Sequence, residues 1–168
     1  MQQMRIAIIG QGRSGHDIHG KFLLGDDSGK YKVVAVVDKI ADRRERAAGE
    51  FGCDTYEDYH ELFSRDDIDI VVNSTFSFEH YPITLDLLSH GFNVLVEKPF
   101  AMRYADCKDM IETAEKHSCN LFVFQQSRFA PYYTKIREVV DSGVLGRIVQ
   151  ISIRFSGFSR RWDWQTSQ

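Results

Sequence analysis

The sequence lacks the features that mark several common classes of protein. Its 168 residues carry a formal net charge of −3 at pH 7, which gives no attraction toward nucleic acid or an anionic membrane surface. No apolar run approaches the roughly 20 residues of a membrane-spanning helix, and repeats and low-complexity segments are absent. We therefore expect no nucleic-acid and no membrane partner. The length indicates one domain, or one domain and part of another.

Cysteine is also scarce. The three residues Cys53, Cys107 and Cys119 are an odd number, and they lack the close spacing of metal ligands. Neither a disulfide framework nor a zinc site is indicated, and each cysteine is interpreted as a reduced thiol. We accordingly expect a cytoplasmic protein without a bound metal.

The most informative feature that is present is the glycine-rich segment at residues 10–15, GQGRSG. The apolar stretch 4–9 before it has strand character, and residues 14–24 after it have a helical pattern. A second apolar stretch, 32–37, ends on Asp38, roughly 20 residues after the last glycine. Strand, G-x-G-x-x-G, helix, second strand and terminal acid together predict a dinucleotide-binding site.

Each glycine has a physical role in the predicted site. Gly10 permits a tight turn, Gly12 lets the backbone approach a pyrophosphate, and Gly15 lets the helix and the strand pack closely. The pyrophosphate would lie at the helix N-terminus, at Arg13 and Ser14, where free N–H groups and the helix dipole favour an anion. The alternative is an ordinary glycine-rich turn.

The acid at the end of the second strand bears on the choice of cofactor. Asp38 can accept hydrogen bonds from the adenosine ribose hydroxyls, and its charge repels a 2′-phosphate, which favours NAD over NADP. Arg43 and Arg44 follow closely and could receive a 2′-phosphate, so NADP remains open. They are more simply the polar face of a helix, and a solvated aspartate is the alternative for Asp38.

Strand-like and helical segments alternate along the chain. This predicts an α/β fold with a doubly wound parallel sheet and helices on both faces, the Rossmann NAD(P)-binding fold. Residues 68–73 are apolar without alternation, as expected for a strand covered on both faces, and Gly52 fits a helix C-cap. The expected strands are 4–9, 33–37, 68–73, 93–96 and 121–124, and the expected helices are 14–24, 41–51, 56–63, 78–90, 104–117 and 132–141.

The pattern changes after Gly146. Residues 148–155 alternate between apolar and polar side chains, which predicts a strand with one solvated face. No partner strand follows, and residues 159–165 place two tryptophans beside two arginines. We therefore expect residues 1–127 to form the NAD(P)-binding domain. Residues 128–168 would be the connecting helix and first strand of a second α/β domain that is otherwise missing.

Polar segments follow three of the predicted strands, where a doubly wound sheet binds its ligand. In the first, the small residues Ser74 and Thr75 could let backbone approach the ribose and nicotinamide. His80 then begins the next helix, and a histidine with no special role is an equal alternative. The third segment contains Arg128, which could meet a polar substrate or a phosphate, although an anchor at the joint between domains is the simpler interpretation.

The second segment is Glu97-Lys98-Pro99. A lysine at a strand end that is followed at once by proline is held in place rather than free on a helix surface. Such a lysine can donate to a substrate oxygen, so Lys98 is the candidate catalytic residue. The alternative is an exposed loop lysine that pairs with Glu97. Among the histidines, His19 is expected in a packed or hydrogen-bonded role, and His60, His90 and His117 at the surface.

In their order these motifs resemble the Gfo/Idh/MocA oxidoreductases, the family of glucose-fructose oxidoreductase and inositol dehydrogenase. The resemblance covers essentially the whole chain, and Glu97-Lys98-Pro99 is its most specific part. The matching residues are Gly10, Gly12, Gly15, Asp38, Thr75, His80, Glu97-Lys98-Pro99, Arg128-Phe129, Pro131 and the stretch 141–148.

The resemblance implies a Rossmann domain followed by an α/β domain with a large open sheet. It implies NAD(P)-dependent oxidation or reduction at a hydroxyl or carbonyl carbon of a sugar, cyclitol or similar small molecule. Lys98 would bind the reacting oxygen, and Thr75 and His80 would line the nicotinamide side of the cleft. The predicted cofactor contacts are Gly10, Gly12, Arg13, Ser14, Gly15, Asp38, Ser74, Thr75, His80, Glu97, Lys98 and Arg128.

Two departures from the family pattern limit what the chain is expected to do. Phe76 stands where the family usually has proline after the threonine. The family's catalytic histidine and its neighbouring acid lie in the second domain, outside this sequence. We therefore expect the chain to bind nucleotide and to be nearly inactive, because positioning and acid–base catalysis need that domain.

The sequence thus predicts the nucleotide-binding domain of an NAD(P)-dependent dehydrogenase, with a sugar-like substrate and a homo-oligomeric full-length parent. The alternative is a non-catalytic NAD(P)-binding redox sensor or regulatory module. Lys98 argues against it, since a sensor needs no such group. A methyltransferase also ends its second strand on an acid, but Glu97-Lys98-Pro99 has no place there.

Overall fold

The computed structural model describes residues 3–154 and 156–158. The chain divides into two compact units, residues 1–125 and residues 126–168. The first unit holds a six-stranded sheet with its helices, and the second unit holds a short helical segment.

The sheet runs in the order β3-β2-β1-β4-β5-β6, and each neighbouring pair of strands is parallel. The strand order reverses between β1 and β4, which is the switch point of a doubly wound sheet. The predicted Rossmann-type fold is therefore confirmed. The strands are β1 (Met4–Ile9), β2 (Tyr31–Val37), β3 (Asp54–Tyr56), β4 (Ile70–Asn73), β5 (Val94–Val96) and β6 (Leu121–Val123).

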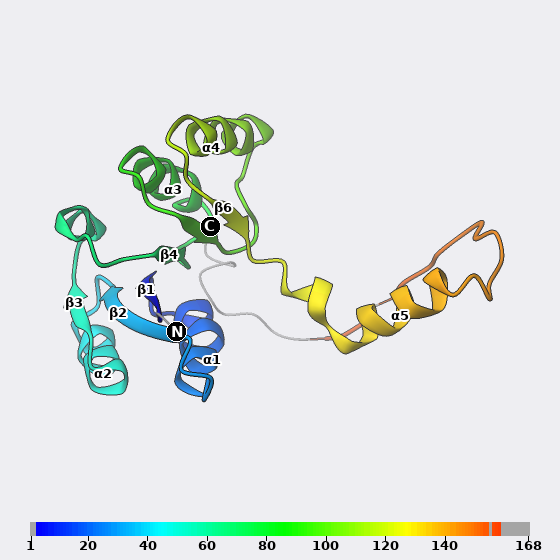
Figure 1. Ribbon diagram of the computed structural model, residues 1–168, viewed down its shortest axis with the longest axis horizontal. Coiled ribbons are helices and arrows are strands. Elements are labelled where there is room, and N and C mark those ends of the chain that lie inside the picture. The colour runs from blue at the N-terminus through cyan, green and yellow to red at the C-terminus, as the bar shows by residue number, and fades with distance from the viewer. Residues whose placement is uncertain (1–2, 155, 159–168) are drawn as a thin grey trace. The chain divides into compact units, whose positions relative to one another are not determined.

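Helices cover both faces of the sheet (Figure 1). The first helix begins as η1 (Arg13–Gly20), wound in the looser π form, and continues as α1 (Lys21–Leu24). It lies with α2 (Ala41–Phe51) on one face, and α3 (His80–Ser89) lies with α4 (Tyr104–Lys116) on the other.

The central strands have apolar side chains on both sides because both sides are covered. In β1, Ala7 and Ile9 join the core that includes residues of α3 and α4. Ile6 and Ile8 join a second core with Ala47 of α2. This arrangement explains why the sequences of these strands do not alternate.

Local signals set the ends of several helices. The helix α2 ends at Gly52, whose φ of +61° is the left-handed conformation that glycine adopts freely, as predicted. The 3₁₀ helix η2 (Tyr59–Ser64) begins with a capping box. The side chains of Asp58 and Glu61 each accept the backbone N–H of the other residue.

Two predicted elements differ from the structure. The short helix predicted at 56–63 is the 3₁₀ helix η2 at residues 59–64, and Tyr56, at its predicted start, instead ends the edge strand β3, which was not predicted. In the described part of the chain, β3 pairs with β2 over three residues. The predicted strand at 148–155 does not form over residues 148–154, and Phe155 and residues 159–165 lie outside the described part of the chain. A strand needs a hydrogen-bonded neighbour, and no described residue pairs with this one, although its apolar side chains are exposed.

The second unit contains η3 (Gln126–Phe129) and α5 (Pro131–Asp141). Pro131 occupies the first turn of α5, where its missing N–H costs no hydrogen bond, and the helix predicted at 132–141 is confirmed. Among the described residues, no helix has the length and apolar character needed to cross a membrane.

Candidate functional site

The loops that follow β1, β2, β4 and β5 meet at one edge of the sheet, because the carboxyl ends of parallel strands share that edge. The glycine loop follows β1, and Asp38 follows β2. Ser74 and Thr75 follow β4, and Glu97-Lys98-Pro99 follows β5. The structure therefore brings the residues predicted from four separate segments to one edge.

The glycine turn is packed tightly against the loop after β4. Gly10 has a φ of +89°, and a Cβ added there would lie 2.7 Å from the Ser74 carbonyl oxygen. A Cβ added at Gly15 would collide with the Gly10 carbonyl oxygen and lie 2.6 Å from Ser74 Oγ. Both positions therefore require glycine, and Gly15 sets the close approach of the first helix to the turn.

The middle glycine is open. A Cβ added at Gly12 would meet nothing closer than Arg43 Nη1 at 3.9 Å. The backbone N–H groups of Arg13 and Ser14 have no partner among the described residues, and no side chain caps the helix that Gly12 precedes. An accessible backbone with free N–H groups at a helix N-terminus suits an anion such as a pyrophosphate.

Asp38 is 8% exposed and is held by the backbone on both sides. Its carboxylate accepts the N–H of Gln11 over 2.7 Å and the N–H of Ile40 over 2.9 Å. Arg43 Nη1 lies 3.4 Å from the same carboxylate. These contacts fix the carboxylate beside the glycine turn, and its remaining lone pair can accept from a ribose hydroxyl.

Arginines from α2 also bond to the backbone near Asp38 and the glycine turn. Arg44 donates to the Asp38 carbonyl over 2.6 Å, and Arg46 donates to the Gln11 carbonyl over 3.1 Å. The Gln11 side-chain amide is buried, and neither its nitrogen nor its oxygen has a partner in the described part of the chain. Sequence reasoning missed Gln11 and Arg46, since neither belongs to the fixed positions of the motif.

The loop after β4 is fixed by its own polar groups. Ser74 Oγ lies 2.8 Å from the Ile9 carbonyl and 2.9 Å from the Gly10 carbonyl, so it ties this loop to the glycine turn. The buried Asn73 accepts from Thr75 Oγ1 over 2.7 Å and donates to Thr84 Oγ1 over 3.0 Å. Asn73 was not predicted as a site residue, although it decides where Thr75 lies.

His80 is almost fully buried, with 1% of its surface exposed. Its Nδ1 donates to the Pro99 carbonyl over 2.7 Å, and its Nε2 lies 3.3 Å from the Thr75 carbonyl. Both ring nitrogens therefore face backbone carbonyls inside the protein. The structure places His80 between the two loops rather than with its ring open to a ligand.

Glu97 is also buried, and it faces the first helix. Its Oε1 lies 3.1 Å from His19 Nε2, and its Oε2 accepts the backbone N–H of Lys98 over 3.1 Å. Burial alone would raise the pKa of Glu97, but the hydrogen bond and charge of His19 and the contact with Lys98 lower it overall. His19 also packs on Phe124, with ring centroids 4.4 Å apart, which agrees with the packed role predicted for it.

Lys98, unlike the buried Glu97, is exposed to solvent. Its ammonium has no hydrogen-bond or ion-pair partner among the described residues. The structure shows no ion pair between the Lys98 ammonium and Glu97, whose oxygens bond to His19 and to the Lys98 backbone N–H, although the charge of Lys98 also helps to lower the pKa of Glu97. A free ammonium at the carboxyl edge of the sheet can bind an oxygen that carries partial or full negative charge.

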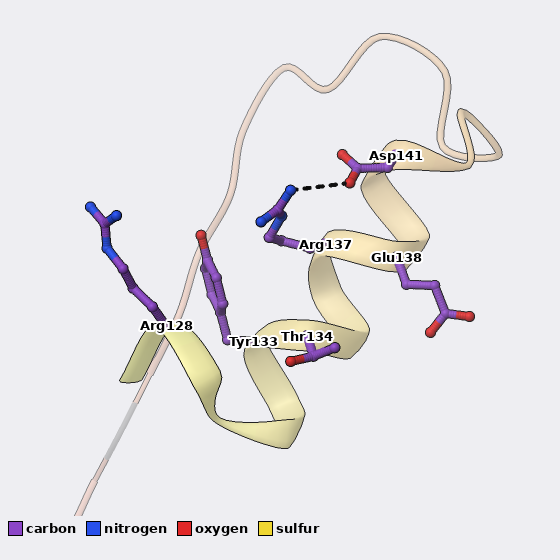
Figure 2. Close-up of a pocket in the computed structure, with 6 residues that line it drawn as sticks. All are labelled: Arg128, Tyr133, Thr134, Arg137, Glu138 and Asp141. Atoms are coloured by element: carbon purple, nitrogen blue, oxygen red, sulfur yellow. Dashed lines mark ion pairs between the residues drawn. The ribbon is translucent and has the colours of Figure 1, made fainter. Parts of the chain in front are cut away.

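Arg128 lies in the second unit, in η3. Figure 2 shows it beside Tyr133 in a shallow pocket that is also lined by Thr134 and Glu138. Arg137 pairs across a turn with Asp141 over 3.7 Å in the same pocket. Arg128 therefore belongs to the unit that contains α5.

An aromatic pair beside the site was not predicted as a feature of it. Phe76 and Phe78 stack with ring centroids 5.7 Å apart, and about half of each residue is exposed. An ion pair of 3.6 Å between Lys39 and Glu79 joins this loop to the residue after Asp38. Phe76 stands where the family pattern usually has proline after the threonine.

Comparison with known proteins agrees with this geometry. The model of an oxidoreductase family with an NAD-binding Rossmann fold, GFO_IDH_MocA, matches residues 4–125. The chain belongs to the Gfo/Idh/MocA oxidoreductase family. The resemblance of the sequence motifs to this family is confirmed.

Curated relatives extend the match over the length of the chain. It is 28% identical over 168 residues to 2,7-anhydro-N-acetylneuraminate hydratase of Mediterraneibacter gnavus, covering 100% of this chain and 42% of the relative. It is 28% identical to inositol 2-dehydrogenase of Salmonella typhimurium, covering 98% of this chain and 49% of the relative. The chain thus spans less than half the length of these relatives.

Solved structures share the fold. The myo-inositol 2-dehydrogenase of Lactobacillus plantarum superposes with a TM-score of 0.80 at 27% identity, over 88% of this chain and 44% of that one. The WlbA dehydrogenase of Chromobacterium violaceum, in complex with NADH and UDP-GlcNAcA, gives a TM-score of 0.79 at 25% identity. That match covers 88% of this chain and 42% of the neighbour.

Proposed function

We propose that the chain is the nucleotide-binding part of an NAD(P)-dependent dehydrogenase that acts on a hydroxyl or carbonyl carbon of a sugar, cyclitol or similar small molecule. The observation that carries this proposal is the free ammonium of Lys98. It lies at the same edge of the sheet as an open glycine loop and the Asp38 carboxylate. The inositol and nucleotide-sugar names among the relatives support the substrate class.

The residues of the chain suit a dinucleotide. The N–H groups of Arg13 and Ser14 and the open Gly12 would hold the pyrophosphate, and Asp38 would hold the adenosine ribose. Ser74 and Thr75 would bring backbone to the nicotinamide ribose. A bound nicotinamide supplies the hydride acceptor or donor.

Lys98 would then act on the substrate oxygen. Its ammonium would bind the hydroxyl or carbonyl oxygen and stabilise the negative charge that gathers there as the hydride moves. Such a group is useful only if its position is fixed before reaction, because orientation supplies a large share of the rate. The proton acceptor and most of the substrate pocket would lie in a second domain that would begin within residues 128–168.

The cofactor preference follows from the charges around Asp38. The carboxylate favours NAD, because it repels a 2′-phosphate and accepts from a 2′-hydroxyl. Arg43, 3.4 Å from that carboxylate, is a cation in reach of the same region. We therefore expect NADH to bind more tightly than NADPH, with NADPH not wholly rejected.

Calorimetric titration of the 168-residue chain with NADH and with NADPH tests this proposal. We expect saturable binding of NADH with the lower Kd. A Gly15→Ala variant, which places a methyl group against the Gly10 carbonyl, should lose binding. Absence of NADH binding by the folded wild-type chain would overturn the proposal.

A further inference from the structure

Two buried histidines form hydrogen bonds with the segment that carries Lys98, one with the residue before it and one with the residue after it. On one side, Glu97 is 4% exposed and His19 is 7% exposed, and they lie 3.1 Å apart. A carboxylate only accepts, so the His19 Nε2–H donates to Glu97 Oε1. The other carboxylate oxygen, Oε2, accepts the Lys98 N–H over 3.1 Å, so His19 and the Lys98 backbone share one carboxylate.

On the other side, the hydrogen bond from His80 Nδ1 to the Pro99 carbonyl is short, at 2.7 Å. His80 is fixed in turn, because Asn73 donates to its backbone carbonyl over 3.3 Å and its Nε2 faces the Thr75 carbonyl. The residues immediately before and after Lys98 are therefore each bonded to a buried histidine.

The two histidines come from different parts of the nucleotide site. His19 belongs to η1, whose N-terminus follows the glycine turn, and His80 opens α3 after the loop that carries Thr75. The position of Lys98 is thus set by the pyrophosphate side and by the nicotinamide side of the proposed site together. The Lys98 ammonium makes no hydrogen bond or ion pair with the described residues, so no bond of its own side chain fixes this position.

We propose that His19, acting through Glu97, and His80 are positioning residues that fix the backbone of Lys98, so that its flexible side chain starts from a defined point. The role of Lys98 toward a substrate oxygen rests on the proposed function. The positioning itself does not, because it is built from contacts within the chain.

Amide hydrogen exchange of the 168-residue chain without nucleotide tests the inference. The Lys98 N–H is the reporter, and the Val71 N–H, which donates to the Asn93 carbonyl over 2.9 Å inside the sheet, is the reference. We expect His19→Leu and His80→Leu to raise the exchange rate of Lys98 relative to Val71 about tenfold.

Conservative variants separate positioning from simple loss of structure. Glutamine places an amide N–H near the position of His Nε2, and asparagine places one near His Nδ1. His19→Gln and His80→Asn should therefore restore the Lys98 rate to within about threefold of the wild type. His16→Gln and His90→Asn are matched controls on η1 and after α3, and their ring nitrogens bond elsewhere. Neither control should change the ratio.

The possible results distinguish positioning of Lys98 from general destabilisation. A selective rise at Lys98 that the conservative variants reverse supports the inference. An unchanged Lys98 rate in both leucine variants overturns it, and so does an equal rise at Lys98 and Val71, which indicates general destabilisation. NADH titration of the wild-type chain is read separately, so failure of the nucleotide proposal is distinguishable from failure of this one.

Discussion

Gln11 and Asp38 join the glycine turn to the end of β2, because the Gln11 backbone N–H donates to the Asp38 carboxylate over 2.7 Å. The same carboxylate accepts the Ile40 N–H and lies near Arg43, so three of its roughly four acceptor sites are engaged within the chain. The acid therefore shapes the turn and also keeps capacity for a ribose hydroxyl.

Because Asp38 fixes the turn and can also accept from a ribose hydroxyl, Asp38→Asn should change nucleotide binding. The amide keeps one acceptor oxygen and loses the charge, so NADH should bind about tenfold or more weakly, as expected for loss of charge-assisted hydrogen bonds. NADPH binding should fall less, because repulsion of the 2′-phosphate is removed. Calorimetry of both nucleotides checks this, with the exposed Asp42→Asn as control. An unchanged ratio of the two Kd values would show that Asp38 does not select the cofactor.

Glycine substitutions should separate the tight turn from an ordinary helical position. Gly15→Ala forces a methyl group against the Gly10 carbonyl, and we expect it to lower the free energy of unfolding by about 1–3 kcal/mol. Gly49→Ala on the exposed face of α2 meets no atom within 4 Å and should stabilise the chain by about 0.5–1 kcal/mol. Urea unfolding of both variants measures the difference. Equal effects of the two substitutions would contradict the packing described at Gly15.

Local patterns were enough to predict most of the first unit. Apolar runs between turn signals identified five of the six strands in the described residues. Four of these five, β1, β2, β4 and β5, place side chains in the cores on both faces of the sheet. The edge strand β3 was missed, since its sequence, Asp54-Thr55-Tyr56, contains no apolar run. The strand expected at 148–155 does not form over residues 148–154, because an alternating pattern does not produce a strand without a hydrogen-bonded partner.

The sequence likewise predicts some residues of the candidate site and not others. Gly10, Gly15 and Asp38 follow from motif spacing, because each occupies a fixed position in the strand–turn–helix–strand pattern. The pairing of His19 with Glu97 joins residues 78 positions apart, and no sequence spacing predicts it. The sequence predicted that His80 lies at the start of a helix, but it did not predict what the side chain does. The burial of His80 and its bond to the Pro99 carbonyl depend on how two loops pack.

The lowered pKa of Glu97 predicts acid sensitivity. Burial opposes the charged form, but His19 and the Lys98 N–H favour it more strongly, so the folded pKa lies below that of the unfolded chain. This stabilising contribution is complete above the ordinary glutamate pKa of about 4.3 and is lost as the pH falls through the folded value. Glu97→Gln should lower stability at neutral pH and lessen its decline below about pH 4.5. Urea midpoints from pH 3 to about pH 7 test this, with the exposed Glu112→Gln as control, and parallel profiles for wild type and Glu97→Gln would contradict it.

The free charge of Lys98 should also distinguish the two oxidation states of the cofactor. The nicotinamide ring is positively charged in NAD⁺ and neutral in NADH, and a cation nearby disfavours only the oxidised ring. Lys98→Met should therefore strengthen NAD⁺ binding relative to NADH by up to about fivefold, as expected for removal of one solvent-exposed charge about 4 Å away. Lys108→Met on α4, where the lysine pairs with Glu112, should leave the ratio unchanged. Calorimetric Kd values for both nucleotides decide the matter. If Lys98→Met and Lys108→Met give the same ratio as the wild type, Lys98 does not lie near the nicotinamide, and its proposed role at the reacting oxygen fails with it.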